Sequence, residues 1–261
     1  MQPSPALPTP VSRVPEIIAH RGASRDAYEN TLAAFALALE QGADGIELDV
    51  HATADGAVVV HHDPVVHRRS GGRAEAVPIA SLTAADLGDC RLPSGDRIPT
   101  LAEVFALVGD RAALYVEVKG RGMAPLVAAL LDAHPTVRSA VHAFDHRVPV
   151  AVRRMRPSTP IGLLSASYPL DVRRLLAGTG AAAFWQHVDL IDEAMVEAIH
   201  AEGVRVIAWT VNETPRAREL AAWGVDALCT DAPGAIRAAL AAAGTEAADA
   251  AVHPLGPGAK R

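Results

Sequence analysis

The sequence has few cysteines. Only Cys90 and Cys229 occur among 261 residues, and they lie far apart. Two distant cysteines argue against a disulfide framework and do not have the spacing of a zinc knuckle. They are compatible with the reducing cytoplasm, where we expect the protein to act.

Long apolar runs are also missing. No run approaches the roughly 20 residues of a membrane span. Residues 1–14 are Pro-rich and lack the basic start and apolar stretch of a signal peptide. We therefore expect a soluble protein that is not exported and has no membrane span.

An excess of basic residues is absent as well. The chain has 24 Lys and Arg against 30 Asp and Glu, a formal charge of −6. This balance argues against a protein that coats nucleic acid or an anionic membrane, so an anionic substrate must be attracted locally. Half of the residues are hydrophobic, which is enough to bury a sizeable core.

The length suits one (β/α)8 barrel, which typically needs about 250 residues. Short β-branched or apolar runs alternate with Ala/Leu-rich segments of helical period, the pattern of repeated βα units. Doubly wound sheets share this alternation, but the length, the count of eight and the positions of polar residues favour a TIM barrel. We predict one domain over residues 15–242, with disordered tails at 1–14 and 243–261.

The predicted strands are short. They are Glu16–Ala19, Gly45–Val50, Ala113–Val118, Ser139–Phe144, Pro160–Leu164, Ala182–Trp185, Val204–Trp209 and Asp226–Leu228, with an additional β segment at Ala57–His61. The predicted helices are Thr31–Gln41, Leu101–Val108, Ala124–Ala133, Val148–Met155, Pro169–Ala177, Asp192–Glu202, Pro215–Trp223 and Pro233–Ala242. Several of them open on a Thr, Asp or Pro suited to a helix start.

Acidic residues gather at the ends of two predicted strands. Glu47 and Asp49 lie two residues apart on the second strand, and Glu117 ends the third. Because side chains alternate along a strand, Glu47 and Asp49 share a face, and adjacent strands bring the three carboxylates together. Such carboxylates repel one another unless a cation neutralises them.

A divalent cation is therefore the expected partner of these acids. A single acid is more often on the surface or in a salt bridge. Glu47 and Glu117, however, lie in apolar runs, where an unpartnered charge is costly. Oxygen ligands without cysteine favour Mg²⁺, Ca²⁺ or Mn²⁺ over zinc.

Two basic residues are candidates for anion binding. Arg21 lies beside Gly22, which leaves the backbone room for a ligand, and phosphate is the favoured interpretation there. Lys119 shares a face with Glu117, and its spacing fits an ion pair as well as a phosphate contact.

A series of short motifs resembles the ordered motifs of the glycerophosphodiester phosphodiesterase family. They run from about Ile17 to Pro233 and are His20-Arg21-Gly22, Glu29-Asn30-Thr31, Glu47-Leu48-Asp49-Val50, Asp55-Gly56, His62-Asp63, Glu117-Val118-Lys119, Trp209-Thr210-Val211-Asn212 and Thr230-Asp231. One departure is Tyr28, where the family usually has Pro before Glu-Asn-Thr. It bears on the shape of that loop more than on the chemistry.

The resemblance implies a role for each matching residue. The implied metal ligands are Glu47, Asp49 and Glu117, the acid and base are His20 and His62, the phosphate contacts are Arg21 and Lys119, and Trp209 walls the pocket. It also implies metal-dependent hydrolysis of small glycerophosphodiesters to sn-glycerol 3-phosphate and an alcohol. The order of the two histidines stays open, as does the choice between water and a glycerol hydroxyl as the nucleophile.

The other polar candidates have weaker support. We expect His61 to face away from the site, because consecutive strand residues point in opposite directions. His51 and His142 have no motif support, and His67, His134, His146, His200 and His253 fall in predicted loops, helices or the tail. Asp63 suits an orienting or capping role, Asp231 could equally cap the last helix, and Trp209 could simply pack. We interpret Gly71-Gly72 as a flexible turn.

Three rival functions fit parts of the sequence. Lys119 could form a Schiff base in an aldolase-type lyase barrel, but that leaves three carboxylates unexplained. A non-catalytic phosphodiester-binding barrel is possible on fold alone, but it needs no pair of histidines. A phospholipid-cleaving lyase that stops at a cyclic phosphate would fit the same fold, although no apolar membrane-binding loop is evident.

Overall fold

At the centre of the computed structural model, which describes residues 14–70 and 73–252, eight parallel strands form a closed barrel. The strands are β1 (Glu16–His20), β2 (Gly45–Ala52), β6 (Ala113–Val118), β7 (Ser139–Ala143), β8 (Ile161–Ser165), β9 (Ala183–His187), β10 (Arg205–Trp209) and β11 (Ala227–Thr230). Strand β1 pairs with both β2 and β11, which closes the ring. The predicted (β/α)8 architecture is confirmed.

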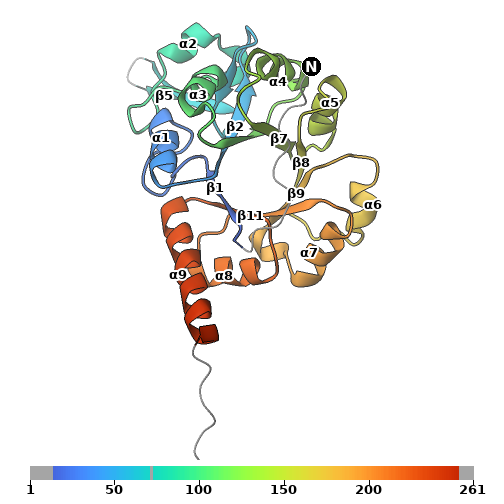
Figure 1. Ribbon diagram of the computed structural model, residues 1–261. Coiled ribbons are helices and arrows are strands. Elements are labelled where there is room, and N and C mark those ends of the chain that lie inside the picture. Colours follow the sequence, from blue (N-terminus) through green and yellow to red (C-terminus); the bar gives the residue numbers. More distant parts are fainter. Residues whose placement is uncertain (1–13, 71–72, 253–261) are drawn as a thin grey trace, which may run out of the picture.

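Each barrel strand is followed by a helix on the outside of the ring (Figure 1). The helices are α1 (Leu32–Glu40), α3 (Leu101–Val108), α4 (Ala124–Ala133), α5 (Arg147–Met155), α6 (Val172–Leu176), α7 (Glu193–His200), α8 (Thr214–Ala222) and α9 (Pro233–Val252). Thr31 and Asp192, which open two predicted helices, each accept a hydrogen bond from a first-turn backbone N–H, and Thr100 does the same before α3.

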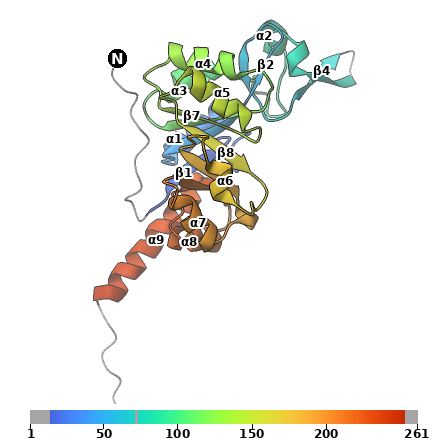
Figure 2. The same ribbon diagram turned by 90° about the vertical axis from the view of Figure 1, so that its right-hand side faces the viewer.

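An insertion between β2 and α3 is larger than the sequence predicted. It contains β3 (Val58–Val60), the hairpin β4 (Val65–Ser70) and β5 (Arg73–Pro78), the 3₁₀ helix η1 (Ile79–Ser81) and α2 (Ala84–Gly88). Figure 2 shows that it projects to one side of the barrel. A small apolar cluster that includes Val59, Ile79 and Leu87 holds it together. Gly71-Gly72, interpreted as a turn, lies outside the described residues.

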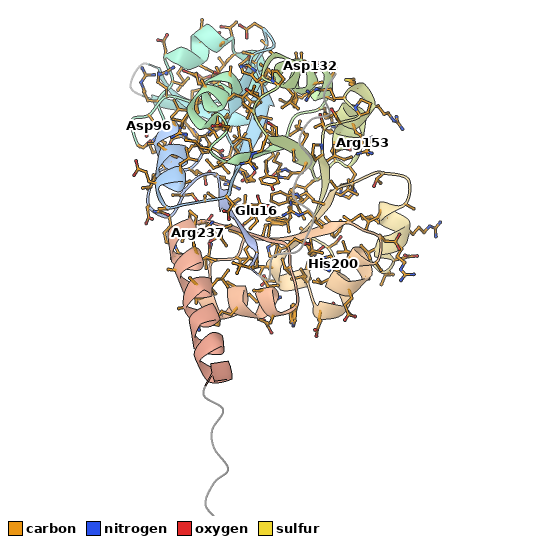
Figure 3. All side chains as sticks on the ribbon, viewed as in Figure 1. Glu16, Asp96, Asp132, Arg153, His200 and Arg237 are labelled. Carbon is orange, nitrogen blue, oxygen red and sulfur yellow. The ribbon has the colours of Figure 1, made fainter. Side chains whose placement is uncertain are left out.

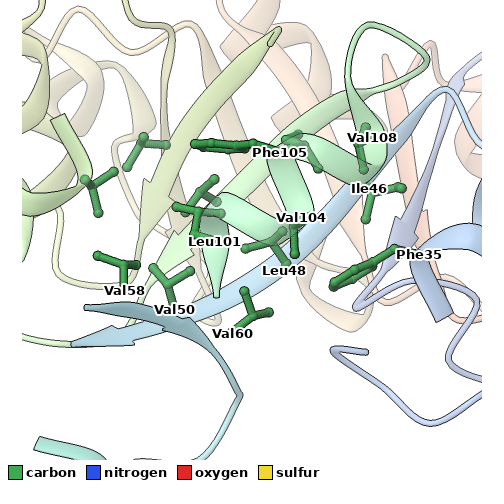
Figure 4. Packing of buried hydrophobic residues seen from close by; sticks show 14 of the residues in the cluster. Phe35, Ile46, Leu48, Val50, Val58, Val60, Leu101, Val104, Phe105 and Val108 are labelled. Carbon is green, nitrogen blue, oxygen red and sulfur yellow. The ribbon is translucent and has the colours of Figure 1, made fainter. Parts of the chain in front are cut away.

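The alternation of β2 separates the core from the site. Ile46, Leu48 and Val50 point outward and pack against helices, together with Phe35 and Phe105 (Figure 4). Glu47 and Asp49 point to the interior, and both are buried. Because these two carboxylates are buried inside the barrel, they need polar partners there, and other strands supply those partners.

Large aromatic side chains fill the barrel below its mouth. Tyr115 and Trp185 meet edge to face, with ring centroids 5.3 Å apart. Small residues make room for them. A Cβ atom at Gly162 would come within 2.6 Å of Nε1 of Trp185, so this position of β8 tolerates no side chain without displacement.

An ionic network lies at the opposite end of the barrel from the strand carboxyl ends. Glu16, inside the ring in Figure 3, accepts hydrogen bonds from the Tyr115 hydroxyl at 2.8 Å and from Nη2 of Arg205 at 2.7 Å. The three groups come from three different strands. They therefore tie the base of the barrel together.

The last helix is longer than predicted. We expected it to end at Ala242, but α9 continues to Val252. Its added residues are rich in Ala, the strongest helix former, which offsets Gly244. Residues 1–13 and 253–261 of the predicted tails lie outside the described part, so the domain limits stay a prediction. No helix among the described residues is long and apolar enough to cross a membrane.

Candidate active site

The carboxyl ends of the strands surround a cavity of about 240 Å³. It is lined by His20, Arg21, Glu47, His62, Glu117, Lys119, His142, Phe144, Leu164, Trp185, Trp209 and Cys229. Every residue that we predicted for the site lines this cavity except Asp49, which lies directly beside Glu117 in the β2–β6 register. Residues from all eight barrel strands and their loops thus converge at one point.

Glu47 and Glu117 are buried within the site, with 2% and 7% of their surface exposed. Burial, followed by repulsion from Asp49, raises the pKa of Glu117 to about 7. Burial, Asp49 and Glu117 together raise the pKa of Glu47 well above its ordinary value. Oε1 of Glu47 has no hydrogen-bond partner among the described residues. Both carboxylates therefore suit a cation as partner.

Asp49 has a different environment from the two glutamates. Its Oδ1 lies 3.2 Å from Nζ of Lys119, and its Oδ2 lies 3.1 Å from Nε of Arg21. Asn30 donates a further hydrogen bond to Oδ2 at 2.8 Å. Burial opposes ionisation of Asp49, but these contacts outweigh it and lower its pKa. Among the three carboxylates, Asp49 is therefore the one that contacts both basic residues.

The loop after β1 aims Arg21 into the cavity. Arg21 adopts a left-handed backbone conformation with φ of 56°. The next position requires glycine, because a Cβ at Gly22 would lie 2.7 Å from the backbone of Ala34. The guanidinium binds Glu29 at 2.9 Å in addition to Asp49. Lys119 contacts Glu117 at 2.7 Å. The site thus contains two fixed cations beside three carboxylates.

Asp231 is a partner of His20 that the sequence left ambiguous. Nδ1 of His20 lies 2.7 Å from Oδ1 of Asp231. Ser24 and Asn212 donate further hydrogen bonds to the same carboxylate at 3.0 and 2.6 Å. Although burial alone would raise it, contact with His20 and these donors brings the pKa of Asp231 down to about 2. The carboxylate therefore orients His20, with Nε2 left to face the cavity, 4.0 Å from Glu47.

His62, which also lines the cavity, forms a second histidine–aspartate pair. Its Nδ1 lies 2.9 Å from Oδ1 of Asp63, so Asp63 has the orienting position that we considered for it. A ring nitrogen of His51 contacts the backbone carbonyl of His62 at 3.0 Å and fixes this segment. His61 does not line the cavity, and burial lowers the pKa of its imidazole. Both histidines follow β3 rather than lie within it.

His142 is a cavity residue that we set aside on sequence grounds. It is 1% exposed, and its ring stacks on Trp185 at 4.2 Å with an interplanar angle of 4°. A ring nitrogen of His142 and carboxylate oxygens of Glu47 and Glu117 lie within 4.8 Å of one another. Burial lowers the pKa of His142 to about 3, which keeps the imidazole neutral. Its position could have indicated a role in the site, because His142 lies on the inward face of its strand and the β6–β7 register pairs it with Glu117.

Aromatic side chains form the outer wall. Trp209 meets Phe144 edge to face at 5.5 Å and His187 at 5.1 Å. Phe144 is 47% exposed, and Nζ of Lys119 lies 5.9 Å from its ring centroid. Trp209 is thus part of an aromatic rim beside the cations, whereas the sequence had pointed to Trp209 alone.

The sequence profile of the glycerophosphoryl diester phosphodiesterase family matches residues 20–235, which is most of the chain. The chain belongs to this family. A glycerophosphodiester phosphodiesterase from Caldanaerobacter subterraneus subsp. tengcongensis is 35% identical over 228 residues, which cover 83% of this chain and 94% of the relative. The resemblance seen in the motifs is confirmed.

Solved structures of phosphodiesterases share the fold. One from Oleispira antarctica, in complex with the product sn-glycerol-3-phosphate, superposes with a TM-score of 0.80 at 27% identity, covering 87% of this chain and 97% of that one. A glycerophosphodiester phosphodiesterase from Thermotoga maritima gives a TM-score of 0.72 at 27% identity, covering 86% and 97%. The family's barrel therefore extends over nearly all of the described chain.

Proposed function

We propose that this member of the glycerophosphodiester phosphodiesterase family hydrolyses small glycerophosphodiesters to sn-glycerol 3-phosphate and an alcohol, with a divalent cation as cofactor. The observation that carries the proposal is the arrangement of the cavity. Two histidine–aspartate pairs flank a buried group of carboxylates and fixed cations. Family membership supports the same reaction class.

The donor set fits one hard divalent ion. The resemblance implies Glu47, Asp49 and Glu117 as its ligands. The unpartnered Oε1 of Glu47 and the raised pKa values of Glu47 and Glu117 agree with this. Asp49 would share its oxygens with Arg21 and Lys119. Bound Mg²⁺, Ca²⁺ or Mn²⁺ would offset negative charge on the phosphate.

Arg21 and Lys119 bind the nonbridging phosphate oxygens in this proposal. Both side chains enter the cavity, and Asp49 holds both by ion pairs. A guanidinium can hold two oxygens at once, whereas an ammonium acts as a point charge. Fixed cations stabilise the extra charge of the five-coordinate phosphorus without reorganising.

The histidines move the protons. One accepts the proton of the attacking oxygen on its free ring nitrogen, the P–O bond to the alcohol breaks, and the other donates its proton to the departing oxygen. The attacking group is water, or the neighbouring glycerol hydroxyl followed by hydrolysis of a cyclic phosphate. A cyclic product trapped early and detected by phosphorus NMR would identify the second route.

The aromatic rim receives the organic portion of the substrate. Trp209 and Phe144 present apolar ring surface at the cavity entrance, next to the cations that hold the phosphate. Such surface suits carbon chains of glycerol and the alcohol. We also propose that the protein acts in the reducing cytoplasm, where the buried free thiols of Cys90 and Cys229 would persist.

A head-group screen with metal depletion tests the function. The protein is incubated with glycerophosphodiesters of different alcohols, and released sn-glycerol 3-phosphate is measured before chelation, in chelator, and after Mg²⁺, Ca²⁺ or Mn²⁺ is restored. We expect release that stops in chelator and returns with metal. Binding of diesters without release would favour a non-catalytic barrel instead.

The Schiff-base alternative has its own test. Neighbouring Asp49 and Glu117 offset the effect of burial and raise the pKa of Lys119, so its amine stays protonated and is a poor nucleophile. Borohydride added with a carbonyl substrate should leave the protein unlabelled. Covalent labelling that Lys119→Arg abolishes would favour the aldolase.

A further inference from the structure

Two buried polar groups in the cavity face each other without a hydrogen bond. Nε2 of His142 lies 3.9 Å from Oε1 of Glu47, which is beyond hydrogen-bond length. Oε1 of Glu47 and Nδ1 of His142 are both buried without a hydrogen-bond partner in residues 14–70 and 73–252. Leaving Oε1 of Glu47 unsatisfied is costly, so the space between this oxygen and Nε2 of His142 suits a third participant.

A cation between them satisfies the geometry. Ligand atoms of one ion lie about 2.0–2.6 Å from it, and so no more than about 5 Å from one another. The ring nitrogen of His142 and the oxygens of Glu47 and Glu117 meet this limit, all within 4.8 Å. An imidazole nitrogen is a common metal ligand, and Nε2 of His142 is the nitrogen that faces Glu47.

The position of His142 is fixed before any ion binds. Its ring lies parallel to Trp185 at 4.2 Å, and Gly162 leaves the space that Trp185 occupies. The β6–β7 register sets His142 beside Glu117. A ligand whose rotamer is held by packing loses little entropy on binding a metal.

The contacts of Asp49 leave room for another donor. Both of its carboxylate oxygens contact a cationic side chain, Lys119 at Oδ1 and Arg21 at Oδ2. By contrast, His142 has no ionic partner within hydrogen-bond distance in the described chain. Glu47 and His142 thus have no contact with a Lys or Arg side chain among the described residues, and Glu117, whose Oε1 contacts Lys119, has a carboxylate oxygen within 4.8 Å of both.

We propose that His142 is a nitrogen ligand of the divalent cation that Glu47 and Glu117 bind. The proposal rests on the metal dependence put forward under "Proposed function" and adds a mixed nitrogen and oxygen donor set. Imidazole favours transition metals, whereas carboxylates and water also suit Ca²⁺ and Mg²⁺. The site should therefore bind Mn²⁺ more tightly than Ca²⁺, and His142 should be the source of that preference.

Pulsed electron paramagnetic resonance on the Mn²⁺-loaded protein tests this directly. A directly bound imidazole gives a ¹⁴N modulation of the Mn²⁺ signal. We expect the modulation in the wild-type protein and in His51→Gln, a matched control that removes another buried histidine near the site. It should be absent in His142→Gln. His20→Gln should also keep the modulation. Although Nε2 of His20 lies 4.0 Å from Glu47, Asp231 holds the His20 ring through Nδ1.

Calorimetric titration gives a second readout. His142→Gln should weaken Mn²⁺ binding by about 10–100-fold, the range found when groups supporting a metal site are removed, and should change Ca²⁺ binding much less. Bound Mn²⁺ without ¹⁴N modulation in the wild-type protein would overturn the assignment even if the variant failed to fold. So would modulation that persists in His142→Gln. Failure of Mn²⁺ to bind at all would overturn the metal dependence as well.

Discussion

Nδ1 of His20 lies 2.7 Å from Oδ1 of Asp231, a residue 211 positions later in the chain. The contact fixes the ring so that Nε2 faces the cavity. Because Ser24 and Asn212 also bind this carboxylate, its position is determined independently of His20. Asp231 is therefore a positioning residue for the proposed acid–base chemistry.

Replacing Asp231 by Asn should reduce kcat by about 10²–10⁴-fold, because the amide no longer enforces the ring orientation and tautomer of His20. Steady-state kinetics on a folded, metal-loaded variant measure this. The double variant His20→Ala, Asp231→Asn should have a kcat little lower than that of His20→Ala alone. Additive losses would mean that Asp231 acts elsewhere.

The adjacent histidines should differ in their effects. His62→Ala should lower kcat by about 10²–10⁴-fold, since His62 lines the cavity and contacts Asp63, whereas His61→Ala should change it little. The kinetics of the two variants, compared at equal metal loading, provide the check. Equal losses would move the site assignment by one residue.

The stability of the metal-free protein should depend on pH through Glu117. Its pKa is raised from an ordinary 4.5 to about 7, so between these values the folded state binds more protons than the unfolded state. The free energy of unfolding should then fall as the pH rises from about 4.5 to about 7. Urea unfolding in chelator measures the slope. Glu117→Gln should make the slope of the free energy of unfolding against pH shallower, and the slope that remains should come from Glu47. An unchanged slope would show that Glu117 is not its source.

The network at the base of the barrel should serve stability rather than activity. Glu16→Gln leaves the charge of Arg205 without its partner and should lower the free energy of unfolding by about 3–5 kcal/mol. Tyr115→Phe removes one hydrogen bond and should cost less, about 1–3 kcal/mol. Chemical denaturation gives both values. The kcat of folded Glu16→Gln should stay near wild type, and a large loss would show coupling between the two ends.

The barrel and most of the cavity were predictable because both depend on strand alternation. Once Glu47 and Glu117 are placed on neighbouring parallel strands, their proximity follows. The hairpin of β4 and β5 was not predictable in the same way. Among the described side chains of this hairpin only Val66 is buried, so the hairpin has a weak hydrophobic pattern.

The sequence also did not show which residues of the site contact one another. Nothing local distinguishes a capping Asp231 from one that holds His20, and only the closed ring brings β1 and β11 together. Likewise Asp49 and Glu47 look equivalent in spacing. The structure separates them, because Asp49 forms ion pairs with Arg21 and Lys119, whereas the Glu47 carboxylate has no Lys or Arg side-chain nitrogen within 4.0 Å among the described residues.

The stacking of Trp185 on His142 also makes the protein its own optical probe. The chain has three tryptophans. Trp185 stacks on His142 and lines the cavity, and Trp209 meets Phe144 at the rim. Trp223 lies at the end of α8 against the guanidinium of Arg216 and is not among the residues that line the cavity. Indole emission responds to nearby charge and ring contacts. Cation loading should therefore alter the Trp185 component and head-group docking the Trp209 component, while Trp223 supplies a constant background in unlabelled samples.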